Sequence, residues 1–224
     1  MCGRYTSTAA FDELALRFGI TVESGTNEEL TARYDVAPTQ AIPIITASDK
    51  GRRLRMAKWG FRPAWVHDNK LAPINARVEA VAMSRLFGAA VPDGRCLVPA
   101  TGFYEWQLVR GQKRKQPYFV RLKGGVPFAF AGLWTPPADA ESPPPCAIIT
   151  TNANELLAPI HNWMPVILDP DDEALWLDPG CIAPMKVPPC LRPFPSERME
   201  AILVSSLVSS PNNEGPELIE PVPA

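Results

Sequence analysis

The sequence predicts an α+β fold, with one domain whose core is a curved, largely antiparallel β-sheet or partial barrel flanked by helices. Short segments rich in β-branched and aromatic residues outnumber segments with helical periodicity. Strands and helices do not alternate regularly, as they would in a parallel α/β fold. The 224 residues, 46% hydrophobic and 21% charged, fit one globular domain over residues 1–224, with a flexible C-terminal end.

Three segments predict helices. Residues 8–19 (TAAFDELALRFG) bring apolar side chains to one face, with acidic residues near the start and Gly19 as a stop signal. Further helices are expected within residues 75–88 and 171–178, and the Pro-rich segment 135–145 is expected to be a surface loop. The expected strands are residues 41–46, 53–60, 95–100, 117–122, 127–134, 146–151, 165–168 and 201–205.

Composition excludes several classes of protein. No apolar run approaches the ~20 residues of a membrane span, and charged residues interrupt the first twenty positions, so we expect a cytoplasmic protein without a membrane partner. The five cysteines contain no CxxC pair, which argues against a disulfide framework and a close-spaced zinc site, Cys181 and Cys190 included. We therefore expect a monomer with no metal and no organic cofactor.

Charge is distributed unevenly along the chain. The formal net charge is −2, but residues 1–124 carry +8 and residues 125–224 carry −10. Basic residues cluster at 51–62 and 110–115. The total argues against a generally basic nucleic-acid-binding protein, whereas the clusters are compatible either with solvated loops or with a nucleic-acid surface.

A cysteine directly after the initiator methionine is the most specific feature of the sequence. Chain termini usually have little to pack against, so this cysteine is either incidental or a reagent. Removal of Met1 would leave Cys2 with an α-amine and a thiol on adjacent carbons. Their unperturbed pKa values, about 7.7–8.0 and about 8.5, leave each a usable deprotonated fraction near neutrality. Both nucleophiles can therefore act on one electrophilic carbon, and the second attack is intramolecular.

Glu105 and His161 are candidates for proton transfer. Glu105 lies between Tyr104 and Trp106, an aromatic environment that can raise a carboxyl pKa into a useful range. On the residues alone, a surface glutamate is the favoured interpretation of Glu105, and His161 is equally compatible with a structural histidine.

Seven stretches together resemble the SOS response-associated peptidase (SRAP) family. They occur in the family's order over nearly the whole chain: MCGRY, RYDVAPTQ, WGFRPAW, NARVE, CLVPATGFYEW, HNWMPVIL and LVSSLVSSPNNEGPELIEPV. The resemblance implies a single domain with a barrel-like sheet core and a positively charged groove. It also implies recognition of abasic sites in single-stranded DNA, which are trapped as a covalent crosslink through Cys2 and associate the protein with the nucleoid.

The implied chemistry agrees with the start of the chain. The ring-opened abasic sugar presents an aldehyde, with which the Cys2 amine condenses to an imine before the thiol closes a thiazolidine. By resemblance, Glu105 shuttles protons, His161 assists sugar opening and Asn75 orients the sugar, while arginines grip phosphates. Pro38 and two tryptophans would form a wall against bases, although either tryptophan is equally compatible with a core position. The implied DNA-contacting residues are Gly3, Arg4, Pro38, Trp59, Trp65, Arg77 and Thr150.

The chain departs from the family pattern at three positions. Val78 and Ala80 replace hydroxyl residues, and Trp163 replaces an arginine. Two other functions remain open. One is a cysteine peptidase with Cys2 as nucleophile, which could act only to remove Met1. The other is a module that reads modified DNA bases without reacting.

Overall fold

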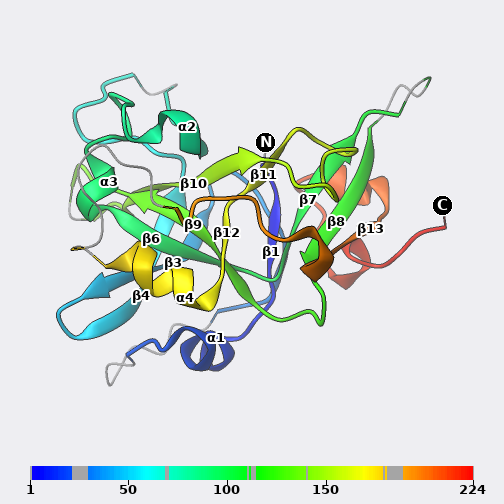
Figure 1. Cartoon of the computed structure of the whole chain (residues 1–224), viewed down its shortest axis with the longest axis horizontal. Helices are drawn as coiled ribbons and strands as arrows, with labels where there is room; N and C mark the ends of the chain where they lie inside the picture. The colour runs from blue at the N-terminus through cyan, green and yellow to red at the C-terminus, as the bar shows by residue number, and fades with distance from the viewer. Residues whose placement is uncertain are drawn as a thin grey trace.

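Two β-sheets and four short helices make up the part of the chain that is described in the computed structural model. That part comprises residues 2–21, 30–68, 71–109, 111, 115–139, 141–178, 180 and 189–223. The five-stranded sheet has the order β13-β8-β7-β1-β2 and is antiparallel throughout. Strands β7, β8 and β13 lie side by side in Figure 1. Its strands are β1 (Tyr5–Ser7), β2 (Arg33–Val36), β7 (Gly102–Gln107), β8 (Gln116–Leu122) and β13 (Met199–Leu203).

The eight-stranded sheet curves until its strands close a ring. Strand β10 pairs with both β4 and β9, so the path β10-β4-β3-β6-β9 returns to its starting strand. Among the strand pairings of the described residues in this sheet, those of β10 with β4 and with β5 are parallel and the others are antiparallel. The strands are β3 (Ala41–Ser48), β4 (Gly51–Trp59), β5 (Asn75–Arg77), β6 (Arg95–Ala100), β9 (Phe128–Trp134), β10 (Pro145–Asn152), β11 (Trp163–Pro165) and β12 (Ile167–Leu168). The predicted α+β fold with a strongly curved, largely antiparallel sheet is confirmed.

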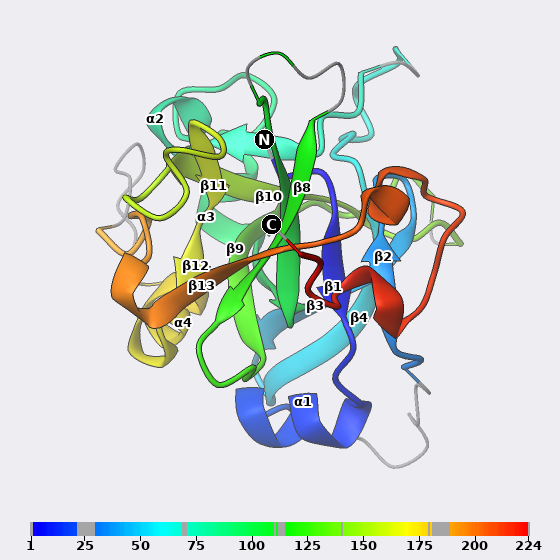
Figure 2. The same cartoon turned by 90° about the vertical axis from the view of Figure 1, so that its right-hand side faces the viewer.

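Helices cover one side of this sheet (Figures 1 and 2). They are α1 (Phe11–Phe18), α2 (Val78–Val81), α3 (Ala90–Asp93) and α4 (Pro170–Leu177). The helices expected at 8–19 and 171–178 are confirmed. The helix expected within 75–88 is largely wrong: residues 75–77 pair with β10 as β5, and α2 is a single turn. Sheet pairing with a buried strand here overrides local helix propensity.

The core has two main layers. One lies between the eight-stranded sheet and the helices, and includes Leu14, Phe18 and Trp176. The other contains side chains from both sheets, with Cys2 and Tyr5 among them. The Tyr5 ring meets two core aromatic rings edge-on, with centroid separations of 5.4 and 5.8 Å. These contacts fix β1, and with it the chain that leads from Cys2.

A buried carboxylate ties the helical layer to the sheet. Glu173 on α4 is 1% exposed and accepts hydrogen bonds from Arg17 of α1 at 2.8 Å and from Arg52 of β4 at 3.3 Å. Burial raises the Glu173 pKa, and the two guanidinium groups oppose this rise. The two arginines therefore compensate a charge that would otherwise be costly to bury.

Replacing Glu173 with Gln should lower the free energy of unfolding by about 3–5 kcal/mol, because two half-buried guanidinium groups lose their counterion. Urea denaturation followed by circular dichroism measures the change. The exposed Glu155→Gln serves as the control and should stay within about 0.5 kcal/mol of the parent protein. Equal urea midpoints for Glu173→Gln and Glu155→Gln would contradict the stabilising role of the Glu173 carboxylate.

Candidate functional site

Cys2 is fully buried just before β1. Its Sγ lies 3.9 Å from the main-chain oxygen of Arg4, and Asn75 Nδ2 donates to the Cys2 carbonyl at 2.8 Å. Burial raises the pKa of the Cys2 thiol well above its ordinary value, and the nearby charge of Glu105 raises it further. The thiol is therefore protonated at neutral pH, and the Cys2 main chain is held in place by β5.

Glu105 lies on β7, the strand that pairs with β1. It is 2% exposed, so the alternative of a surface glutamate is excluded. Burial raises the pKa of Glu105 to about 7. A carboxyl group with this pKa is present in both protonation states near neutrality, as a group that gives and takes protons must be.

Asn75 and Thr150 come together through neighbouring strands. In the parallel pairing of β5 with β10, Asn75 is opposite Ile148 and Arg77 is opposite Thr150. Asn75 Oδ1 and Thr150 Oγ1 are buried and have no hydrogen-bond partner among the described residues. Buried polar atoms are rarely left without a partner, so these two are candidates for contact with a ligand.

His161 and Trp163 precede and begin β11. His161 Nδ1 lies 3.1 Å from the main-chain nitrogen of Trp163 and 3.2 Å from its carbonyl oxygen, which fixes the ring against this residue. Burial lowers the pKa of His161, which favours the neutral imidazole. Arg77 is exposed, and its guanidinium carbon lies 4.0 Å from the centroid of the Trp163 ring. Trp163 therefore contacts both residues.

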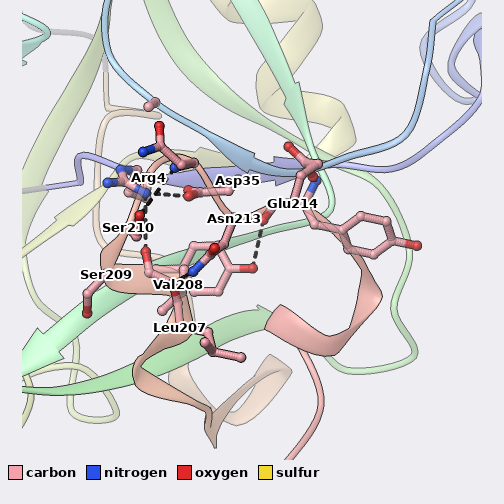
Figure 3. Close-up of polar contacts among 12 residues, drawn as sticks. Arg4, Asp35, Leu207, Val208, Ser209, Ser210, Asn213 and Glu214 are labelled. Atoms are coloured by element: carbon pink, nitrogen blue, oxygen red, sulfur yellow. Dashed lines mark hydrogen bonds and ion pairs between the residues drawn. The ribbon is translucent and has the colours of Figure 1, made fainter.

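Arg4 is held by an internal ion pair (Figure 3). Its NH1 donates to Asp35 Oδ2 and, at 3.2 Å, to the carbonyl oxygen of Val208 in the C-terminal segment. The Asp35 side chain is completely buried, and burial raises its pKa while Arg4 lowers it. Arg4 Nε and NH2 have no partner within the described part of the chain, so they are candidates for contact with a ligand. The sequence analysis did not single out Asp35. An acidic residue in RYDVAPTQ, a stretch otherwise assigned to DNA contact, was the signal that could have indicated an internal ion pair.

The two tryptophans assigned to a stacking wall occupy different environments. Trp59 is completely buried, and its Nε1 donates to the Ile74 carbonyl at 2.9 Å, so it takes the core position that the sequence left open. Trp65 is 57% exposed. Its chain neighbours Ala64 and Val66 line a pocket of about 560 Å³. Thr39 and Arg62 line the same pocket. Trp65 is thus the tryptophan of this pair that reaches solvent.

The remaining assigned residues occupy mixed environments. Gly3 and Pro38 are half-buried, and Pro38 precedes Thr39, whose φ of 72° is unusual outside glycine. Val78 packs into the core beneath the helices, and Ala80 is exposed on α2. Cys96 and Cys146 are buried free thiols and Cys190 is buried, whereas Cys181 and residues 110 and 112–114 lie outside the described residues. No helix of the described chain is both long and apolar enough to cross a bilayer.

Comparisons with known proteins identify the family. Residues 1–211 match the family described as SOS response associated peptidase (SRAP). Over 224 residues the chain is 40% identical to the abasic site processing protein YoqW of Bacillus subtilis (strain 168), covering 98% of this chain and 99% of the relative. It is 29% identical over 229 residues to the abasic site processing protein YedK of Escherichia coli (strain K12), covering 99% and 100%. A crystal structure of a protein from Bacteroides thetaiotaomicron has a TM-score of 0.84 at 27% identity, covering 99% of this chain and 100% of that chain. The chain therefore belongs to the SRAP family.

Proposed function

We propose that this protein processes abasic sites in single-stranded DNA by forming a thiazolidine crosslink through Cys2 after Met1 has been removed. The observation that carries the proposal is the burial of Cys2 beside Glu105, a carboxyl group with a pKa of about 7. The names of the relatives, abasic site processing proteins, support the same substrate.

The neutral thiol suggests the order of the steps. The Cys2 α-amine attacks the sugar aldehyde, and the resulting carbinolamine loses water to give an imine as Glu105 donates a proton to the departing hydroxyl and takes one back from the nitrogen. The thiol sulfur then adds to the imine carbon. Its proton passes to Glu105 and on to the nitrogen, which closes the ring. One water leaves overall, and Glu105 ends in its starting protonation state.

The surrounding residues supply binding and sugar opening. Neutral His161 exchanges a proton with the sugar oxygens as the closed ring opens. Asn75 Oδ1 accepts a hydrogen bond from a hydroxyl of the abasic sugar, and the Thr150 hydroxyl donates or accepts one. Arg77 and the Nε and NH2 groups of Arg4 bind flanking phosphates. Trp65 stacks on a neighbouring base. The encounter is therefore sensitive to salt, whereas the closed ring is not.

A cysteine peptidase acting on other proteins has less support. Catalytic cysteines of that class are held as thiolates by a lowered pKa, and here burial raises the pKa of Cys2. Self-removal of Met1 is compatible with the proposal. A non-covalent reader of modified bases would not need Cys2.

A denaturing gel tests the proposal directly. Processed protein with single-stranded DNA carrying one abasic site should give a heat-stable shifted band. Undamaged DNA and the tetrahydrofuran analogue, which lacks the aldehyde, should give none. Cys2→Ala and Cys2→Ser both keep the α-amine but lack the thiol, so each should lose the heat-stable band and leave only a heat-labile imine, while the matched Cys190→Ala retains the band. An undiminished band with Cys2→Ala would refute the assignment.

The pH dependence of the reaction reports on Glu105. At saturating DNA, the single-turnover rate should show an inflection near pH 7, where Glu105 changes protonation state. Glu105→Gln should react roughly tenfold or more slowly and lose this inflection. Quench-flow sampling between pH 5 and pH 9 on both proteins provides the measurement. An inflection that persists in the variant would assign it to another group.

Glu105 should also lower stability at alkaline pH. Its pKa in the folded protein lies above the ordinary value of about 4.3, so ionisation favours the unfolded chain. The penalty is complete above pH 7 and declines as the pH falls from 7 towards 4. Glu105→Gln should therefore be about 1–3 kcal/mol more stable than the parent at pH 8, with a smaller difference at pH 5. Thermal unfolding at pH 8 and pH 5 measures the stability of Glu105→Gln relative to the parent, with Glu155→Gln as the control. A stability difference that is the same at both pH values would contradict the prediction.

A further inference from the structure

Arg77 is an exposed cation that stacks on the Trp163 ring. None of its N–H groups has a hydrogen-bond or ion-pair partner among the described residues, and its contact is the stack on Trp163 at 4.0 Å. Exposed arginines commonly pair with carboxylates, as Arg121 does with Glu200 and Arg192 with Asp172 here. Arg77 is instead oriented by an aromatic face, which leaves its hydrogen-bonding edge open.

The stack crosses the strand at the centre of the site. Strands β5 and β11 pair with opposite edges of β10, with Arg77 opposite Thr150 on one side and Trp163 opposite Asn152 on the other. The Arg77 side chain therefore extends over β10 to reach the indole, close to Thr150. Through its main chain, Trp163 also contacts His161 Nδ1. Its side chain and its main chain thus serve two separate contacts.

We propose that Trp163 is the positioning residue for Arg77, which it presents as a ready-made binding group for a DNA phosphodiester beside the abasic sugar. This inference rests on the proposed function. A stacked guanidinium keeps its plane while its N–H groups bind a phosphate edge-on, so the indole and the phosphate do not compete. A carboxylate partner would occupy the same N–H groups and would have to be displaced.

Two physical effects follow from the stack. An unsupported arginine loses rotamer freedom when it binds, whereas Arg77 is already ordered by the indole. The bidentate geometry that phosphate prefers is also fixed in advance. Both effects act on binding rather than on bond formation, and neither depends on the DNA sequence.

The test separates binding from chemistry with variants at position 163. Trp163→Phe keeps an aromatic face, and Trp163→Leu removes it; both retain the main-chain contact to His161. Crosslinking rates are measured against the concentration of abasic single-stranded DNA. Trp163→Leu should raise the half-saturating concentration roughly three- to tenfold, with less than a twofold change in the saturating rate. Trp163→Phe should restore most of the loss.

Arg77→Met supplies the matched partner for a double-mutant cycle. If the indole acts through Arg77, Trp163→Leu should have little further effect in an Arg77→Met background. Losing the Arg77 charge should reduce the slope of log affinity against log salt by roughly 0.7, whereas Trp163→Leu retains that charge and the slope. Additive effects, or a Trp163→Leu defect confined to the saturating rate, would overturn the proposal.

Anisotropy with single-stranded DNA carrying the tetrahydrofuran analogue repeats the cycle without a reaction. If wild-type protein forms no crosslink, the proposed covalent function fails, but this binding measurement still tests the coupling between Trp163 and Arg77. Coupled losses of affinity there would support the positioning role, and independent losses would refute it.

Discussion

Pairing of β1 between β7 and β2 fixes a chain terminus that would otherwise be mobile. Tyr5 inserts its ring among the aromatic side chains of the inner core, and the Tyr104 N–H donates to the Arg4 carbonyl at 3.0 Å. The Arg4 side chain is held in turn by Asp35 and the Val208 carbonyl. These contacts are made by Arg4 and Tyr5, which lie within three residues of Cys2. Cys2 is therefore positioned as firmly as other core side chains.

Burial of this segment determines the chemistry of the site. The environment that keeps the Cys2 thiol protonated also brings the Glu105 pKa to about 7, and polar atoms of Asn75 and Thr150 are left without partners among the described residues. Each of these features is unfavourable for folding. The buried thiol, the Glu105 carboxyl group and Asn75 lie together, as is typical of a site in which stability is sacrificed for function. Elsewhere, buried charges such as Glu173 are compensated by arginines.

Local patterns were sufficient to predict much of the fold. Strands with β-branched runs and the amphipathic helix α1 are detectable within a window of a few residues. Strand β5 was missed because Asn75–Arg77 is extended only through its pairing with β10. The motifs identified Cys2, Asn75 and Glu105, which strand pairing brings together. Burial and pairing over long separations could not be predicted: Trp59 is internal, and Arg4 meets Asp35 through contacts that no local pattern encodes.

Mass spectrometry of the crosslinked N-terminal peptide tests the central claim most directly, because it identifies both the residue and the bonds. Protein reacted with abasic single-stranded DNA is digested with protease and nuclease, with and without prior borohydride treatment. The account predicts an adduct on Cys2 whose mass is the sum of the two components less one water. Its mass should not change on reduction, because a closed thiazolidine has no imine to reduce. An adduct that gains hydrogen on reduction, or one attached to a different residue, would contradict ring closure by the buried Cys2 thiol.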